Sequence, residues 1–284
     1  MSAPQLIATC WTTAGDVRAD RRDNLGRFPL EERIEAGARA GYAGTGFWWR
    51  DLVAWQESGR DYAALRRHLA DAGQQLVELE FLNDWFATGD RRARSDKARA
   101  EMFRAADALE ARHVKVIPPF QPDDPKGADL AAEFAALCDE AAGHGLMVGL
   151  EMMPFSTLPN LDAALEMVAA ADAPNGGLLI DIWHVVRSGG AVADVTRVPA
   201  RFIIAAELCD AMMAMQDSIT EDTMCHRKLC GEGEFDVPGF IRAMGEAGYD
   251  GPYGVEILSD DFRQLPLEEA ARRSFETSVA QFGR

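Results

Sequence analysis

Eight short apolar segments recur along the 284 residues of the chain, and the sequence between them has helical periodicity. This alternation indicates buried parallel strands that are joined by crossover helices. The apolar segments lie at 6–11, 44–49, 76–82, 113–118, 146–152, 177–182, 202–208 and 253–258. The helical segments include 30–42, 62–73 and 128–145, and several end at a glycine, as helices commonly do. Eight such units, each of about 35 residues, predict an α/β fold of the (β/α)8 TIM-barrel type.

An open, doubly wound sheet is the alternative architecture for alternating strands and helices. That fold usually carries a glycine-rich phosphate loop after its first strand, and no such loop follows residues 6–11. No linker, low-complexity tract or block of charge divides the chain. We therefore expect one barrel domain over residues 1–284.

The charge of the chain narrows the range of partners. It carries 46 acidic and 29 basic residues, a formal net charge of −17, which repels nucleic acid and anionic membranes and suits small ligands and cations. The five cysteines have no regular spacing, which favours a reducing compartment over a disulfide framework. The sequence shows neither a signal-peptide pattern nor an apolar run of about 18 residues, so we expect a cytoplasmic protein with no membrane partner.

Acidic residues stand at the ends of the last four predicted strands. In GLLIDIWHVV (177–186), Asp181 closes an apolar run that should be buried, and His184 follows it. The first three of the acids are spaced by about one strand–helix unit, and a longer segment, 209–236, precedes the fourth. The four residues are Glu151, Asp181, Glu207 and Glu256.

These positions predict a metal site. The carboxyl ends of barrel strands form the active face, so the four carboxylates should converge there. Any one of them alone is more typical of a helix cap or a solvated loop, but four in register would repel one another without a cation. Ligand sets made only of oxygen favour Mg²⁺ or Mn²⁺. We therefore expect one divalent ion, held by the four acids named above.

Neighbouring residues leave alternatives open. Asp210 replaces Glu207 as the ligand if the seventh strand ends later. His184 suits a ligand, a substrate contact or a turn histidine, and we favour a role in orienting or contacting substrate. Cys225, His226 and Cys230 lie close together, but without a fourth partner at suitable spacing they make a poor zinc site.

Four segments carry a resemblance to a known family: GLEMMP (149–154), DIWHVVRSGG (181–190), ELCDA (207–211) and HRKLCGEGEFDVPGFIRAMGEAGYDGPYGVEI (226–257). They resemble the sugar phosphate isomerase/epimerase superfamily, the xylose isomerase-like TIM barrels. This group includes ketose 3-epimerases, inosose isomerases and dehydratases, 3-dehydroshikimate dehydratases and endonuclease IV. The resemblance covers most of the chain and is strongest from about residue 146 to 258.

The resemblance also implies roles for single residues. Glu151, Asp181 and Glu256 resemble the metal ligands of the family, and His184 resembles its pocket histidine. Glu207 stands where many relatives have a histidine or glutamine ligand, which is a departure from the pattern. Arg227 resembles an arginine that contacts substrate oxygens beside the metal, and we expect the loop that carries it to lie at the surface.

Such a site supports proton transfer next to a carbonyl group. A divalent ion acidifies the neighbouring C–H bond, and Glu151 and Glu256 are the expected general base and acid. Isomerisation, epimerisation and dehydration share this ligand set. Trp11 and Trp183, like other tryptophans near strand ends, are expected to line the substrate pocket. We therefore predict a divalent-metal-dependent isomerase or epimerase of a keto-sugar, inosose or similar polyhydroxy carbonyl compound.

Three other functions can be weighed against the predicted isomerase or epimerase. A dehydratase of an inosose or of 3-dehydroshikimate would use the same residues. A non-catalytic barrel subunit would explain the departure at Glu207. A DNA-repair enzyme like endonuclease IV needs a histidine-rich zinc site and a basic face, which five histidines and a charge of −17 do not supply. The composition is also compatible with a homo-oligomer.

Overall fold

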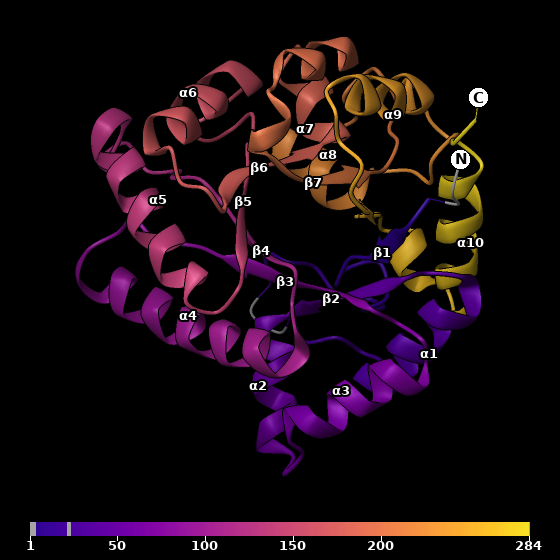
Figure 1. Cartoon of the computed structure of the whole chain (residues 1–284). Helices are drawn as coiled ribbons and strands as arrows, with labels where there is room; N and C mark the ends of the chain where they lie inside the picture. Colours follow the sequence, from indigo (N-terminus) through magenta and orange to yellow (C-terminus); the bar gives the residue numbers. More distant parts are fainter. Residues whose placement is uncertain (1–3, 22–23, 284) are drawn as a thin grey trace.

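A closed barrel of eight parallel strands forms the centre of the protein. The computed structural model describes residues 4–21 and 24–283. In this part of the chain the strands pair in sequence order, and β8 pairs with β1 to close the barrel (Figure 1). The strands are β1 (Leu6–Ala8), β2 (Gly44–Trp48), β3 (Leu76–Leu82), β4 (His113–Val116), β5 (Met147–Glu151), β6 (Gly176–Asp181), β7 (Ile203–Leu208) and β8 (Tyr253–Val255). The predicted TIM barrel and its eight strands are confirmed.

Helices surround the strands on the outside of the barrel (Figure 1). They are α1 (Leu30–Ala40), α2 (Trp49–Glu57), α3 (Tyr62–Asp71), α4 (Gly89–Leu109), α5 (Gly127–Ala142), α6 (Leu161–Ala171), α7 (Ile182–Arg187), α8 (Ile219–Cys225), α9 (Val237–Glu246) and α10 (Leu267–Val279). Short 3-10 helices span Val192–Arg197, Ala200–Phe202 and Phe262–Gln264. Gly41 ends α1 with a φ of 113°, a left-handed conformation that glycine adopts without strain.

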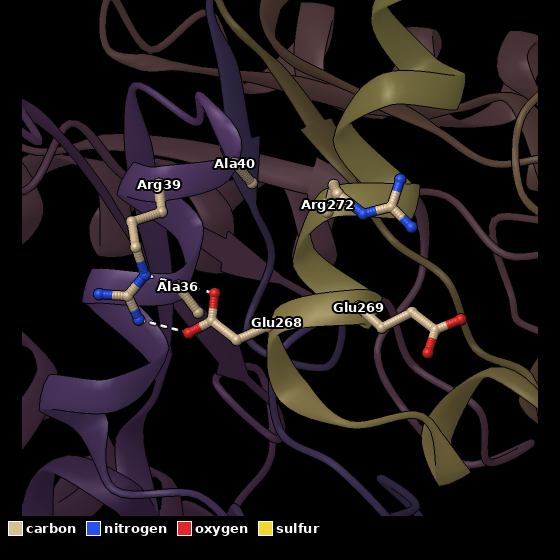
Figure 2. Close-up of a pocket in the computed structure, with 6 residues that line it drawn as sticks. All are labelled: Ala36, Arg39, Ala40, Glu268, Glu269 and Arg272. Carbon is tan, nitrogen blue, oxygen red and sulfur yellow. Dashed lines mark hydrogen bonds and ion pairs between the residues drawn. The ribbon is translucent and has the colours of Figure 1, made fainter.

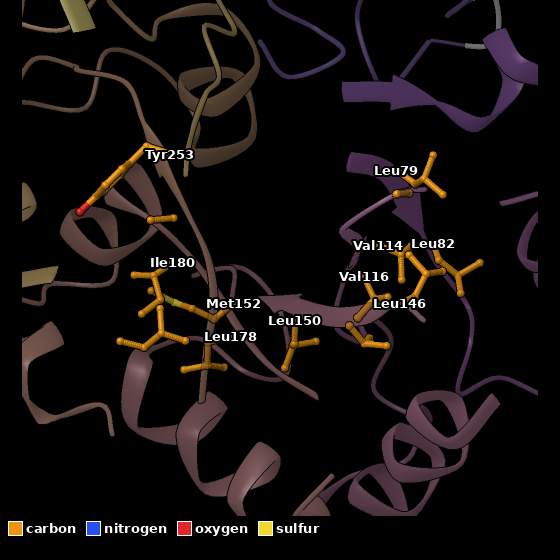
Figure 3. Close-up of a cluster of buried hydrophobic side chains, with 14 of the residues drawn as sticks. Leu79, Leu82, Val114, Val116, Leu146, Leu150, Met152, Leu178, Ile180 and Tyr253 are labelled. Atoms are coloured by element: carbon orange, nitrogen blue, oxygen red, sulfur yellow. The ribbon is translucent and has the colours of Figure 1, made fainter. Parts of the chain in front are cut away.

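The apolar side chains of the strands form the layer between the barrel and its helices. Leu79, Val114 and Leu150 are fully buried, and Figure 3 shows them with other members of this cluster on β3 to β6. Successive side chains of a strand point to opposite faces, so apolar residues on the helix side leave alternate residues for the interior of the barrel.

The interior of the barrel is charged. Glu78 and Glu80 alternate with apolar residues on β3, and His113 and Lys115 do the same on β4. Lys115 contacts acids of β7 and of the β8 exit, which places its side chain inside the barrel. Glycines leave the room that these long side chains need: a Cβ on Gly46 would lie 2.6 Å from an Oε1 of Glu80.

The outer surface of the protein has a hollow between α1 and α10. Its lining residues are Ala36, Arg39, Ala40, Glu268, Glu269 and Arg272. Arg39 pairs with Glu268 across the two helices (Figure 2), and Arg272 pairs with Glu276 one turn along α10. The basic side chains of this hollow are therefore paired with acidic ones. Because its lining residues belong to α1 and α10, the hollow lies at a contact between two outer helices and is not part of the barrel mouth. Among the described residues, no helix has the length and apolarity that a membrane crossing requires.

The room beside Gly46 gives a test of the interior packing. A Cβ there would also lie 2.8 Å from the backbone nitrogen of Cys10, which cannot move freely. We expect Gly46→Ala to lower the free energy of unfolding by about 1–3 kcal/mol in urea titrations. Gly245→Ala is the control, because nothing lies within 4 Å of its added Cβ and alanine favours the helix by about 1 kcal/mol. Equal stability of the two variants would contradict this account.

Candidate active site

Four carboxylates meet at the carboxyl ends of four consecutive strands. Glu151 and Asp181 end β5 and β6, Glu207 is the penultimate residue of β7, and Glu256 follows β8 directly. One oxygen of each carboxylate lies within 4.8 Å of the others, and all four residues are buried. The strand register produces this arrangement, because Asp181 pairs with Glu207 across β6 and β7. The predicted convergence of the four acids is confirmed.

Lys115 lies among these acids. Its Nζ is 2.6 Å from Glu207 Oε1, 2.9 Å from Glu256 Oε1 and 3.9 Å from Glu151 Oε2. Glu80, on the neighbouring β3, is a further contact at 3.1 Å. The ammonium group is fully buried, so these carboxylates replace its water shell.

Arg227 supplies a second buried cation. Its Nη1 donates to Asp181 Oδ2 at 2.6 Å and lies 3.1 Å from Glu256 Oε2. Its Nη2 donates to the hydroxyl of Thr223 at 3.0 Å, and its Nε donates to the carbonyl of the same residue at 3.3 Å. Arg227 therefore ties α8 to two acids of the site.

His184 and the start of α7 hold two of the acids in place. His184 Nε2 lies 3.2 Å from Glu151 Oε1 and 3.9 Å from Asp181 Oδ2. Asp181 Oδ1 accepts a hydrogen bond from the backbone N–H of Trp183 at 2.8 Å, which caps α7. The helix-cap alternative for Asp181 is therefore correct for one oxygen, while the other faces Arg227.

The surroundings push the acid pKa values in opposite directions. Burial would raise the pKa of Glu151, but the charge of Lys115 and the hydrogen bond from His184 outweigh it and lower that pKa to about 2. Burial raises the pKa of Glu256 and holds that of Glu207 well above its usual value, although Lys115 opposes both shifts. Glu151 is therefore ionised at neutral pH, while burial makes Glu207 and Glu256 resist ionisation.

The donor set fits a hard divalent cation. All four acids offer oxygen, the ligand type that Mg²⁺ and Mn²⁺ prefer. Among the described residues, no donor makes a well-directed hydrogen bond to either oxygen of buried Glu207, although Lys115 lies beside one of them. Burial raises the pKa of Glu256, and the charges of Glu151 and Glu80 add to that shift. A second group, Glu151, Asp181 and His184, also has ligand spacing.

A cavity of about 120 Å³ opens above the acids. Of the four carboxylates, only Glu151 and Glu256 line it, together with His184, Lys115 and Arg227. Its walls are mainly apolar and consist of Trp11, Ala19, Phe81, Ile117, Phe120, Met153, Phe155, Met224 and Leu258, with Thr223 beside them.

The two predicted tryptophans occupy different places. Trp11 lines the cavity and packs at 5.4 Å from the ring of Trp48. Trp183 is fully buried outside the cavity lining, where it packs edge-on against His184 at 5.0 Å. The structure does not bring Trp183 to the cavity wall, because its ring is fully buried at the start of α7. Trp183 instead supports His184 and, at 5.3 Å, the guanidinium of Arg227.

The segment 209–236 differs from expectation in two ways. A surface position was expected for Arg227, yet its side chain is only 1% exposed, because α8 and a bridge between His226 and Ser259 fold the segment over the mouth. Asp210 does not replace Glu207. Its carboxylate accepts backbone N–H groups of the loop residues Ala211, Gly231, Gly233 and Phe235.

Lys115 is the main site residue that the sequence analysis missed. The signal is present in HVKVIP (113–118), where His113 and Lys115 alternate with valines. A strand with one apolar face puts such residues on the opposite face, which in a barrel is the interior. The aromatic wall residues Phe120 and Phe155 lie outside any regular strand, and their near-parallel rings are 5.8 Å apart.

The fold and the acidic mouth together define a TIM-barrel protein with a buried carboxylate centre at the carboxyl ends of its strands. The family model described as xylose isomerase-like TIM barrel matches residues 34–279. The chain therefore belongs to the xylose isomerase-like TIM-barrel family, as the resemblance predicted.

Comparisons with known proteins give several enzyme names. A 3-dehydroshikimate dehydratase of Pseudomonas aeruginosa is 30% identical over 245 residues, which are 85% of this chain and 38% of that protein. The chain thus spans well under half the length of that relative. An inosose isomerase of Halalkalibacterium halodurans is 26% identical over half of each chain. The solved structure of the IolI protein with a bound zinc atom has a TM-score of 0.80 at 18% identity and covers 98% of this chain and 97% of its own.

The burial of Arg227 changes the expected effect of its removal. Arg227→Ala leaves Asp181 without its buried partner, so we expect a loss of about 3–5 kcal/mol in the free energy of unfolding. Arg272→Ala removes an exposed pair on α10 and should change stability by less than about 0.5 kcal/mol. Urea unfolding of both variants tests the difference. An Arg227→Ala protein as stable as the control would show that the ion pair with Asp181 does not support the fold.

Proposed function

We propose that the protein is a divalent-metal-dependent isomerase or epimerase of a neutral polyhydroxy carbonyl compound, such as a keto-sugar or an inosose. One observation carries the proposal: two acids from different strands, Glu151 and Glu256, line one cavity and belong to a cluster of four carboxylates. Two carboxyl groups that face the same cavity can act as base and acid in one reaction.

The two acids divide the proton transfer. Glu151, ionised and held by His184, accepts the proton from the carbon beside the substrate carbonyl. Glu256 lies on another strand, at a raised pKa, and delivers a proton to the substrate. Delivery to the opposite face of the same carbon gives epimerisation, and delivery to the neighbouring carbon gives isomerisation. A Mn²⁺ or Mg²⁺ ion held by Glu151, Asp181, Glu207 and Glu256 would supply the Lewis acid that lowers the pKa of that C–H bond.

The lining of the cavity favours a substrate without phosphate or carboxylate. Among its described lining residues, Lys115 and Arg227 are the permanent cations, and both are already paired with acids of the site. An anionic group on the substrate would therefore face a floor rich in carboxylates. The apolar walls suit the C–H faces of a ring, and hydroxyl groups would turn toward the floor.

A dehydratase is the second candidate, because the Pseudomonas relative carries that name and matches 85% of this chain. Loss of a β-hydroxyl group after the same proton abstraction would require only that Glu256 protonate the leaving oxygen. A 3-dehydroshikimate substrate would bring a carboxylate into the cavity, and the paired state of Lys115 and Arg227 argues against it.

The isomerase or epimerase and the dehydratase can be distinguished by the substrate on which the protein acts. We expect purified protein with Mn²⁺ to exchange the proton beside the carbonyl of an inosose or ketose for deuterium in D₂O, observed by NMR. 3-Dehydroshikimate should remain unchanged, and an aromatic product from it would establish the dehydratase. If every compound stays unlabelled with metal bound, the protein is a non-catalytic barrel.

The metal site can be tested without a substrate. Asp181→Asn keeps the cap on α7 but removes one ligand charge, so it should lose most of the Mn²⁺ that wild type retains. Metal content after dialysis is the measurement. Asp217→Asn, in the exposed segment before α8, should retain metal like wild type. Full occupancy in Asp181→Asn would remove this residue from the ligand set.

The acid role of Glu256 predicts a separation of metal binding from turnover. Glu256→Gln retains an oxygen ligand but cannot transfer a proton, so formation of the epimer or isomer should fall by about 10²–10⁴ while part of the metal remains bound. Glu57→Gln, on an exposed part of α2, is the control. Product formation at the wild-type rate in the metal-loaded variant would assign this proton transfer to another group, with Glu80 and His184 next.

A further inference from the structure

The Lys115 ammonium group contacts three carboxylates at distances typical of charge-assisted hydrogen bonds. Its Nζ lies 2.6 Å from Glu207, 2.9 Å from Glu256 and 3.1 Å from Glu80. Of the three contacts, the one to Glu256 has hydrogen-bond geometry, while the nearest oxygens of Glu80 and Glu207 face the ammonium group without a well-directed hydrogen bond. The alkyl chain of Lys115 extends from β4, on the opposite side of the barrel from the strands that carry two of these acids.

The charges around the lysine do not balance. Glu80, Glu151, Asp181, Glu207 and Glu256 are buried beside two cations, Lys115 and Arg227. With every acid ionised, five carboxylates and two cations leave a formal charge of −3. A divalent ion would reduce this excess, but it would share the carboxylates of Glu207 and Glu256 with the ammonium group, which lies beside one oxygen of each.

We propose that Lys115 is a built-in cation that neutralises Glu207 and thereby weakens the divalent-metal affinity of the site. This inference rests on the proposed metal site and adds to it a residue that sets its strength. Glu207 and Lys115 act as one neutral unit, and Glu151, Asp181 and Glu256 provide the charge that attracts the ion. Arg227 cannot take the place of Lys115, because its Nη1 is held by Asp181 and its Nη2 by Thr223.

The proposal fixes the sign of three changes in affinity. Lys115→Met keeps the length of the side chain and removes the competing charge, so Mn²⁺ should bind about 10- to 100-fold more tightly. Glu207→Gln removes a negative charge while the lysine remains, so binding should weaken about tenfold or more. The double variant restores the wild-type net charge, and its affinity should return to within a few-fold of wild type.

The experiment is isothermal titration of Mn²⁺ into the four proteins, with thermal unfolding in EDTA as a second measurement that needs no metal. In EDTA, Lys115→Met should lower the Tm by about 5 °C or more, and Glu207→Gln added to it should restore most of that loss. Lys97→Met, an exposed lysine of α4, makes the same change of charge away from the site and should affect neither measurement. If Lys115→Met does not fold, Glu207→Gln and the double variant carry the same comparison.

The outcomes separate this inference from the proposed function. If wild type binds Mn²⁺ and Lys115→Met binds it no more tightly, the role of Lys115 is refuted while the metal site stands. If no protein of the set binds Mn²⁺, the metal site itself is refuted, and this inference falls with it.

Discussion

The contact between Lys115 and the carboxylates around it is the interaction on which the centre of the barrel depends. Buried carboxylates a few ångströms apart repel strongly unless a cation or a proton offsets them. Lys115 supplies that cation from β4, and Arg227 supplies another from the segment after β7. Lys115 lowers the pKa of Glu151 against the effect of burial, whereas burial keeps the pKa of Glu256 raised although both cations oppose that shift.

This charged centre requires a barrel interior unlike the usual layers of branched apolar residues. Gly46 and Gly254 leave space on β2 and β8, and a Cβ on Gly254 would lie 2.9 Å from Cγ of Glu207. The apolar layer between strands and helices is complete, so it can support an interior that contributes little hydrophobic stabilisation. The hydrophobic stabilisation from this outer layer thus offsets the energetic cost of burying the polar centre.

The sequence predicted the parts of the site that follow from periodicity. Strands that recur at a regular spacing end on one face, so the convergence of Glu151, Asp181 and Glu207 could be derived from their positions alone. The burial of Arg227 could not, because 209–236 has no period and its path depends on the bridge between His226 and Ser259. The place of Trp183 was also out of reach, since one turn of α7 decides whether a ring faces the cavity or the core.

The apolar walls and the acidic floor of the cavity act together. Rings such as Trp11, Phe81 and Phe155 reduce the water around the acids, and lower polarity strengthens every charge interaction beneath them. The same walls offer few hydrogen bonds, so the orientation of a bound molecule would come mainly from the floor, which Glu151, His184 and Glu256 line. A substrate with several hydroxyl groups and no charge would satisfy both surfaces, whereas an anion would meet the floor with the wrong sign. The proposed selectivity therefore rests on the same excess of negative charge as the proposed site for a divalent cation.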